Sequence, residues 1–172
     1  MKNFILACIT VFFLSSCRQA YYIVRHAEKE TVDGAATMMK NDPSLTEAGK
    51  QRAEDLKEIL KTKKIAYIFS TNTIRTRSTA EPTRAYFKLV TETYKPMPDS
   101  AFILQLKSLK KNVLIVGHSN TVDDIVNGLT GKKSVAGDLP DSEYDNLFVV
   151  TYKKFFGTKI KYERKTYGAP AK

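Results

Sequence analysis

The sequence predicts an α/β fold: a three-layer α/β/α sandwich with a mostly parallel central sheet and a C-terminal antiparallel hairpin. Short apolar runs, among them "AYYIVRH", "IAYIFST" and "NVLIVGHS", are typical of buried strands, and helical patterns separate them. The last segment, "NLFVVTYKKFFGTKIKYERKTY", alternates apolar and polar residues like two antiparallel strands joined near Gly157. Strands that alternate with helices and end in a hairpin favour a mixed sheet covered on both faces.

Four segments have the pattern of helices, and they follow the strands in turn. They are "LTEAGKQRAEDLKEILKTKK", "NTIRTRSTAEPTRAYFKL", "AFILQLKSL" and "NTVDDIVNGLTG". The first would bury one side made of Ala48, Ala53, Leu56, Ile59 and Leu60. In the second, Pro82 predicts a kink or a break, because proline removes a helical hydrogen bond.

Three smaller features complete this prediction. Residues 90–94 are expected to form a short edge strand, and residues 31–41 form a polar surface loop. Gly128 or Gly131 closes the last helix, since glycine adopts the left-handed conformation that ends helices.

Length and charge limit the possible classes of protein. A chain of 172 residues, 42% of them hydrophobic, has the size and composition of one globular domain. The formal net charge of +10 favours anionic partners. Neither quantity identifies a function.

The first residues have the layout of an export signal. Lys2 precedes an apolar run over residues 4–14, which is too short to span a bilayer as a helix. The run ends in "LSSC", which resembles the lipobox of bacterial lipoproteins. We therefore predict a signal peptide over residues 1–16, a lipidated Cys17 and a domain over residues 17–172. Cys8 lies within the predicted signal, so Cys17 would be the only cysteine of the mature chain, and no internal disulfide is expected.

This targeting prediction bears on location and partners. It indicates a membrane protein of the bacterial cell envelope, held by a lipid anchor at Cys17 and facing the periplasm or the cell surface. Export argues against nucleic acid as the anionic partner. Inner or outer membrane and oligomeric state stay open.

The chain has only two histidines, and both directly follow apolar strands. His26 ends "YYIVRH", and His118 lies in "VLIVGHS". The carboxyl ends of parallel strands meet at one edge of a sheet, where ligands of α/β proteins bind. Metal binding is not favoured, since a site needs three or more ligands and acidic residues do not cluster around these strands.

Other residues around the histidines suit a phosphoryl group. Arg25 and Arg75 offer planar forks of donors that match phosphate oxygens. Ser119 opens the helix after the central strand, where free N–H groups attract anions. A neutral imidazole can attack phosphorus, and nearby cations would keep His26 unprotonated.

Four segments together resemble the histidine phosphatase superfamily, which is also called phosphoglycerate-mutase-like. They are "VRHAEK", "LTEAGKQRA", "FSTNTIRTRSTAEP" and "VLIVGHSNT", in the order and spacing of that family. The resemblance implies that His26 becomes phosphohistidine and that Arg25, Arg75 and His118 complete the phosphate pocket. It also implies that neither a metal nor an organic cofactor is needed.

The sequence departs from the family pattern in three places. Ala27 stands where most members have glycine, no glutamate occurs in residues 96–105, and Ser119 rather than aspartate follows His118. The last two differences leave the proton donor open among Glu28, Asp99, Asp141 and Glu143. We favour Glu28, because it follows His26 by two residues on the same loop.

The sequence thus predicts a metal-independent phosphatase that hydrolyses small phosphomonoesters through phosphohistidine on His26. A phosphomutase and a non-catalytic binder of phosphorylated envelope components are the alternatives. No motif identifies the physiological substrate.

Overall fold

The computed structural model describes residues 17–31, 42–154 and 157–170. The predicted signal peptide and most of the polar loop over residues 31–41 lie outside the described residues. Elements follow one another along the chain in the order β1(Cys17–Arg25), α1(Glu47–Leu60), β2(Ile65–Ser70), α2(Ile74–Phe87), β3(Thr91–Thr93), α3(Ser100–Ser108), β4(Asn112–Gly117), α4(Val122–Thr130), β5(Asn146–Lys154) and β6(Thr158–Thr166).

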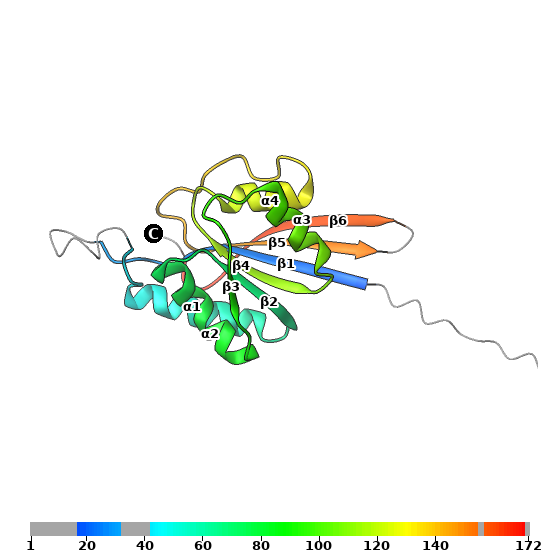
Figure 1. The fold of residues 1–172 in the computed structure, drawn as a ribbon. Coiled ribbons are helices and arrows are strands. Elements are labelled where there is room, and N and C mark those ends of the chain that lie inside the picture. The colour runs from blue at the N-terminus through cyan, green and yellow to red at the C-terminus, as the bar shows by residue number, and fades with distance from the viewer. Residues whose placement is uncertain (1–16, 32–41, 155–156, 171–172) are drawn as a thin grey trace, which may run out of the picture.

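One six-stranded sheet forms the middle layer, with the strand order β3-β2-β4-β1-β5-β6 (Figure 1). Strands β3, β2, β4 and β1 run parallel, whereas β5 pairs antiparallel with β1 and β6 pairs antiparallel with β5. The predicted fold class is therefore confirmed, including the C-terminal hairpin.

Helices cover both faces of the sheet because successive strand residues point to opposite sides. Tyr21 and Ile23 of β1 pack with Phe102 and Leu106 of α3 and with residues of α4. Tyr22 and Val24 belong to the opposite face, which packs against α1 and α2. These are the two outer layers of the predicted sandwich.

The helices differ from the prediction in detail. Ala48 and Ile59 of α1 are exposed, so the predicted apolar side is partly wrong; Gly49 and Arg52 are buried instead. The reason is tertiary, since the start of α1 packs against the loop after β1. A Cβ at Gly49 would lie 2.2 Å from the Glu28 carbonyl oxygen, so this close approach requires glycine.

Helix ends and breaks also follow local rules. Pro82 lies inside α2, which continues from Ile74 to Phe87, so the predicted break is absent. Gly131, with φ 70°, caps α4 in the left-handed conformation, as predicted for one of the two candidate glycines. Among the described residues, no helix is long and apolar enough to cross a membrane.

The carboxyl ends of the parallel strands form the edge of the sheet at which the candidate site lies. The core residues lie between Ala20 and Tyr167. At the carboxyl ends of the parallel strands, the loops after β1, β2 and β4 approach one another.

Candidate active site

A cleft of about 410 Å³ opens at the carboxyl ends of β1, β2 and β4. The sequence-predicted phosphate ligands all line this cleft: Arg25, His26, Arg75, His118 and Ser119. They lie at or after the ends of three strands, β1, β2 and β4, and the parallel register of β1 with β4 and of β4 with β2 brings them together. The cleft is large enough for a phosphoryl group and part of its ester.

His26 is buried and fixed on one side. Its backbone N–H donates to the Gly117 carbonyl oxygen at 2.9 Å, which ties the end of β1 to β4. Its Nδ1 lies 2.8 Å from the Ala27 carbonyl oxygen. Because a carbonyl oxygen only accepts, Nδ1 carries the proton and Nε2 keeps its lone pair. This tautomer is the one that a nucleophile acting through Nε2 needs.

Ala27 follows His26, at the position where the resemblance implies a glycine in most members of the superfamily. Its backbone N–H donates to the Thr79 hydroxyl at 2.9 Å, which links this loop to α2. The methyl group is fully buried and packs with Leu45 and Ala53. The structure thus accommodates the extra methyl group as a small apolar contact.

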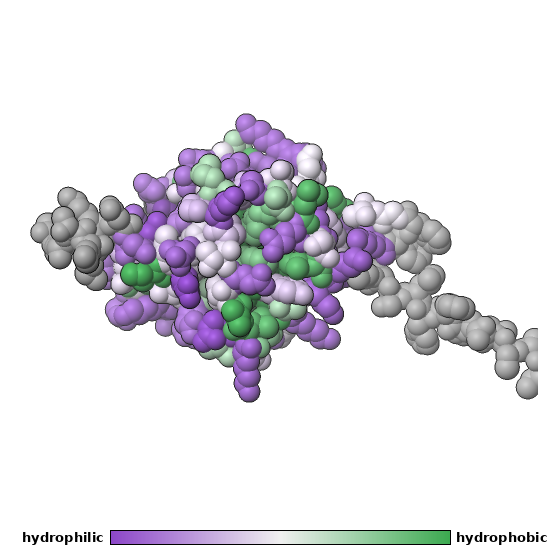
Figure 2. Space-filling view, viewed as in Figure 1, coloured by the Kyte–Doolittle hydropathy of each residue, from purple (hydrophilic) through white to green (hydrophobic). Residues whose placement is uncertain are grey.

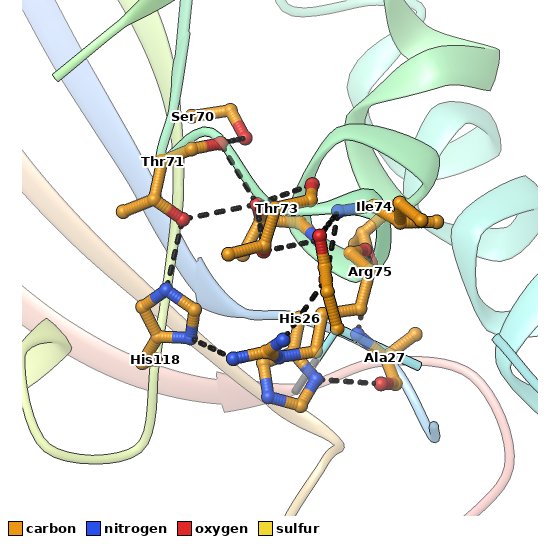
Figure 3. A network of polar contacts seen from close by, with 11 residues as sticks. His26, Ala27, Ser70, Thr71, Thr73, Ile74, Arg75 and His118 are labelled. Carbon is orange, nitrogen blue, oxygen red and sulfur yellow. Dashed lines mark hydrogen bonds and ion pairs between the residues drawn. The ribbon is translucent and has the colours of Figure 1, made fainter. Parts of the chain in front are cut away.

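His118 is oriented by two neighbours, which Figure 3 shows. Its Nε2 lies 2.8 Å from the Thr71 hydroxyl, and its Nδ1 lies 3.5 Å from Nη2 of Arg75. Since a guanidinium only donates, Nδ1 accepts and Nε2 donates to Thr71. The rings of His118 and His26 meet nearly edge to face, with centroids 5.6 Å apart.

The loop before β5 holds Arg25. Nη1 of this arginine donates to the carbonyl oxygens of Pro140 and Asp141 at 2.9 and 3.0 Å, and Nη2 lies 3.2 Å from Asp141 Oδ1. The guanidinium carbon lies 4.2 Å from the centre of the Tyr144 ring. That ring also lies beside His26, with centroids 6.0 Å apart. Residues 140–144 therefore form one wall of the site and fix the cation.

Arg75 lies in the first turn of α2 and has an acidic neighbour. Its Nη1 lies 3.1 Å from Asp42 Oδ1, and the same carboxylate accepts from the backbone N–H of Ile74 at 2.9 Å. Asp42 thus connects the chain before α1 to the start of α2. The Nε atoms of Arg25 and Arg75 are buried and have no hydrogen-bond partner among the described residues.

Burial and the two arginines keep both histidines neutral. Burial, with a further contribution from the charges of Arg25 and Arg75, lowers the pKa of His26 to about 3, although the hydrogen bond to Ala27 acts in the opposite direction. Burial and the same two arginines lower the pKa of His118 to about 4. An imidazole with such a low pKa is unprotonated and nucleophilic at neutral pH.

The interpretation of Glu28 as the proton donor conflicts with the geometry. Both of its carboxylate oxygens accept from Nε of Arg52, at 3.0 and 2.9 Å, and one accepts from Nη2 at 2.6 Å. Burial acts to raise the pKa of Glu28, but these hydrogen bonds and the charges of Arg52 and Arg25 together outweigh it and lower the pKa. A general acid needs contact with the leaving group in the cleft. Glu28 instead ties the loop after β1 to α1, and it does not line the cleft.

The other three candidate donors are separated by their positions. Asp99 caps α3 by accepting from the Phe102 N–H at 2.9 Å, and the Glu143 carboxylate accepts from Asn146 and Arg164. Asp141 alone of the four candidates lines the cleft, with its side chain 99% exposed.

Sequence reasoning gave no role to three contributors: Thr71, Tyr144 and Asp42. Thr71 had a usable signal, since it directly follows the strand "IAYIFS" at the same edge as both histidines. Tyr144 and Asp42 lie in irregular segments, and only the folded chain brings them to the arginines. Among the described residues, no group of three or more metal-ligating side chains is placed to hold a metal ion.

The fold and the cleft define a three-layer α/β protein with paired histidines and arginines, a set suited to a phosphoryl group. The model of the histidine phosphatase superfamily (branch 1) matches residues 21–97, which include His26 and Arg75. The resemblance to this superfamily is therefore confirmed. His118 lies beyond the matched residues, and the fold places it in the same cleft.

Solved structures share the fold at low sequence identity. A candidate phosphohistidine phosphatase, SixA from Agrobacterium tumefaciens, is 20% identical with a TM-score of 0.57; the match covers 88% of this chain and 98% of that one. The mycobacterial glucosyl-3-phosphoglycerate phosphatase Rv2419c, in complex with inorganic phosphate, is 13% identical with a TM-score of 0.57, over 84% and 95% of the two chains. Phosphoglycerate mutase from Bacillus anthracis str. Sterne is 15% identical with a TM-score of 0.55, over 80% and 89%. No curated protein matches the chain.

Proposed function

We propose that the protein is a cell-envelope lipoprotein phosphatase that hydrolyses phosphomonoesters through a phosphohistidine on His26. One observation carries the catalytic part. The buried, neutral imidazole of His26 lines the cleft with its Nδ1 proton donated to Ala27, which leaves Nε2 as the nucleophilic atom. The match to the histidine phosphatase superfamily supports a phosphatase.

In the first chemical step, Nε2 of His26 attacks phosphorus in line with the ester oxygen. The P–N bond forms as the P–O bond breaks, and the alcohol leaves with a proton. Arg25 and Arg75 stabilise the charge on the phosphoryl oxygens, since catalysis of phosphoryl transfer depends mainly on alignment and charge. His118 joins them once its Nδ1 takes up a proton, which the negative charge of a bound phosphoryl group favours. Water then attacks the phosphohistidine, the P–N bond breaks, and inorganic phosphate leaves with His26 regenerated.

Asp141 is the acid that we now propose for the leaving alcohol. Of the four candidates, this carboxyl group alone lines the cleft, and its contact with Arg25 places it beside the phosphate pocket. Its exposure allows it to exchange protons with solvent between turnovers. A general acid at this position would matter most for alkyl esters, whose alkoxides leave poorly.

The location is proposed from the sequence. The segment "LSSC" after a charged and apolar leader favours lipidation of Cys17, which would hold the domain at a bacterial membrane. A phosphomutase is disfavoured in that compartment, because glycolytic intermediates are cytosolic. A binder of phosphorylated envelope components is the remaining alternative, but it would not need a neutral histidine positioned as a nucleophile.

Hydrolysis of an aryl phosphate by the purified chain from residue 17 onward, with a chelator present, tests the activity. We expect turnover that requires His26 and is inhibited by vanadate, which mimics the transferred phosphoryl group. His26→Asn with unchanged thermal unfolding is the matched control. Tight binding of phosphoesters without turnover between pH 4 and 9 would favour the binder. Transfer of phosphate between substrates in place of its release would favour the mutase.

A further inference from the structure

A group of exposed cations lies at the end of the domain opposite the cleft. There β1, β2 and β4 begin and β5 ends, and Figure 1 shows this end on the right. Seven exposed cations lie in the segments that meet there, and we call them the basic end: Arg18, Lys63, Lys64, Lys110, Lys111, Lys153 and Lys154. None of the seven forms an ion pair within the part of the chain that the structure describes.

The pairing of the sheet places cations side by side. Arg18 of β1 lies directly opposite Lys153 of β5, and Lys153 lies opposite Lys159 of β6. Residues opposite one another on neighbouring strands point to the same face, so three positive side chains line up across three strands. Like charges in this arrangement repel, and an external anionic surface would relieve the repulsion.

A hollow of about 500 Å³ adjoins this row of charges. Arg18, Lys63 and Lys64 line it, together with Tyr22 and Asn112. The Asn112 side chain fixes its shape, because its Oδ1 accepts from the Ala20 N–H at 2.9 Å and its Nδ2 donates to the Lys63 carbonyl oxygen. Three cations around a polar hollow match a phosphate headgroup.

Two of the lysines occupy backbone positions that disfavour a side chain. Lys64 and Lys110 have φ values of 50° and 52°, in the left-handed region. Glycine would fit both turns with less strain. The side chains at these two turns project their charge at the basic end.

We propose that the basic end docks on anionic phospholipid headgroups, with the hollow at Arg18, Lys63 and Lys64 receiving a phosphate. The choice of a membrane over another polyanion rests on the proposed anchor, because Cys17 is the first residue of β1 and pairs with Lys154. An acyl chain there would leave no linker between lipid and sheet. Basic clusters beside a lipid anchor add to membrane binding by attraction to anionic lipids.

This orientation has a consequence for catalysis. β1 is nine residues long, so the cleft at its other end lies about 30 Å from Cys17. The cleft therefore faces away from the bilayer, and its substrates come from the aqueous side rather than from the headgroups beneath the domain.

Vesicle flotation with the unlipidated Cys17→Ser chain from residue 17 onward tests the docking surface. We expect binding to vesicles that contain phosphatidylglycerol, weakening as salt rises, and none to phosphatidylcholine alone. The triple variant Arg18→Gln, Lys63→Gln, Lys64→Gln should bind roughly 10- to 100-fold more weakly. A control with the same loss of charge elsewhere, Lys50→Gln, Lys95→Gln, Lys165→Gln, should bind like the wild type.

Other outcomes would overturn the proposal. They are equal binding by the two triple variants, equal binding to both kinds of vesicle, or preferential binding to a soluble anionic polysaccharide. Aryl phosphate hydrolysis by the same variants should match the wild type, since none of the substituted residues lines the cleft. The vesicle assay therefore tests the docking surface separately from the proposed phosphatase activity and from the lipidation of Cys17.

Discussion

The Thr71 hydroxyl lies 2.8 Å from Nε2 of His118, and this contact decides which nitrogen of the histidine faces the phosphate pocket. The Thr71 hydroxyl also lies 3.0 Å from the Thr76 hydroxyl, so the first residue after β2 is linked to α2. The orientation of His118 therefore depends on the junction between β2 and α2, which also carries Arg75.

Removing this hydroxyl should misplace His118 without unfolding the protein. We expect Thr71→Val to lower kcat about 10- to 100-fold, because small displacements of a catalytic group are costly. Thr71→Ser keeps the hydroxyl and should recover most of the rate. Equal activity of both variants in steady-state kinetics would show that Thr71 does not position His118.

The phosphoenzyme should form on His26 and on no other residue. We expect His26→Ala to abolish both turnover and the acid-labile phosphoenzyme, measured by rapid quench with labelled substrate. Arg25→Ala, Arg75→Ala and His118→Ala should each lower the rate by about 10² or more, as for loss of a preorganised charge-stabilising donor. A labelled phosphoenzyme that persists in His26→Ala would place the nucleophile elsewhere.

The two low histidine pKa values predict how stability varies with pH. Both are about 3 to 4 in the folded state, against an ordinary value of 6.5, so the unfolded chain binds more protons below about pH 6.5. Above that pH the two histidines do not reduce the free energy of unfolding. Below it the free energy of unfolding decreases as the pH drops, by up to about 1.4 kcal/mol per pH unit for each histidine. Urea unfolding at pH 7 and pH 5 measures this, and a His26→Asn, His118→Asn chain should lose most of the difference. An unchanged pH dependence in that chain would contradict the low pKa values.

Glu28 should act on stability rather than on the leaving group. Glu28→Gln weakens the hydrogen bonds to Arg52, whose side chain is 3% exposed, and we expect a loss of about 1.5–3 kcal/mol in the free energy of unfolding. Any loss of activity should be equal for alkyl and aryl phosphates. A loss confined to alkyl phosphates would restore Glu28 as the proton donor.

Asp141→Asn provides the complementary comparison. If Asp141 protonates the leaving alcohol, this variant should slow alkyl phosphate hydrolysis by roughly 10²–10⁴ and leave an aryl phosphate almost unaffected. The asparagine keeps the oxygen that contacts Arg25, so the phosphate pocket stays formed. Equal losses on both substrates would mark Asp141 as a residue that only orients Arg25.

Lipidation of Cys17 makes a separate prediction. The full chain expressed in a bacterium should fractionate with membranes, and Cys17→Ala should not be processed normally, because no thiol remains to be acylated. Immunoblots of the fractions, with mass analysis of the mature N-terminus, measure both. A wild-type chain found entirely in the soluble periplasmic fraction would contradict the anchor.

The sequence by itself determined the layers of the fold and the set of histidines and arginines that line the cleft. Apolar strands such as "VLIVG" can be predicted from the sequence because their residue pattern is local. The sequence also shows directly that His26 and His118 follow such strands. Parallel strands then bring those ends together whatever the details of the loops. The resemblance of four short segments to one superfamily predicts His26 as the nucleophile for the same reason.

The tertiary structure decided what depends on contacts between distant segments. Glu28 is close to His26 in sequence, but Arg52 of α1 binds its carboxylate and makes it a structural ion pair. Asp141 lies 116 residues from Arg25, and no local pattern predicts that the loop before β5 folds back to it. Hydrogen bonds and ion pairs between irregular segments depend on the path of the chain in space. The pattern of apolar and polar residues predicts which segments are buried, but it does not predict that path.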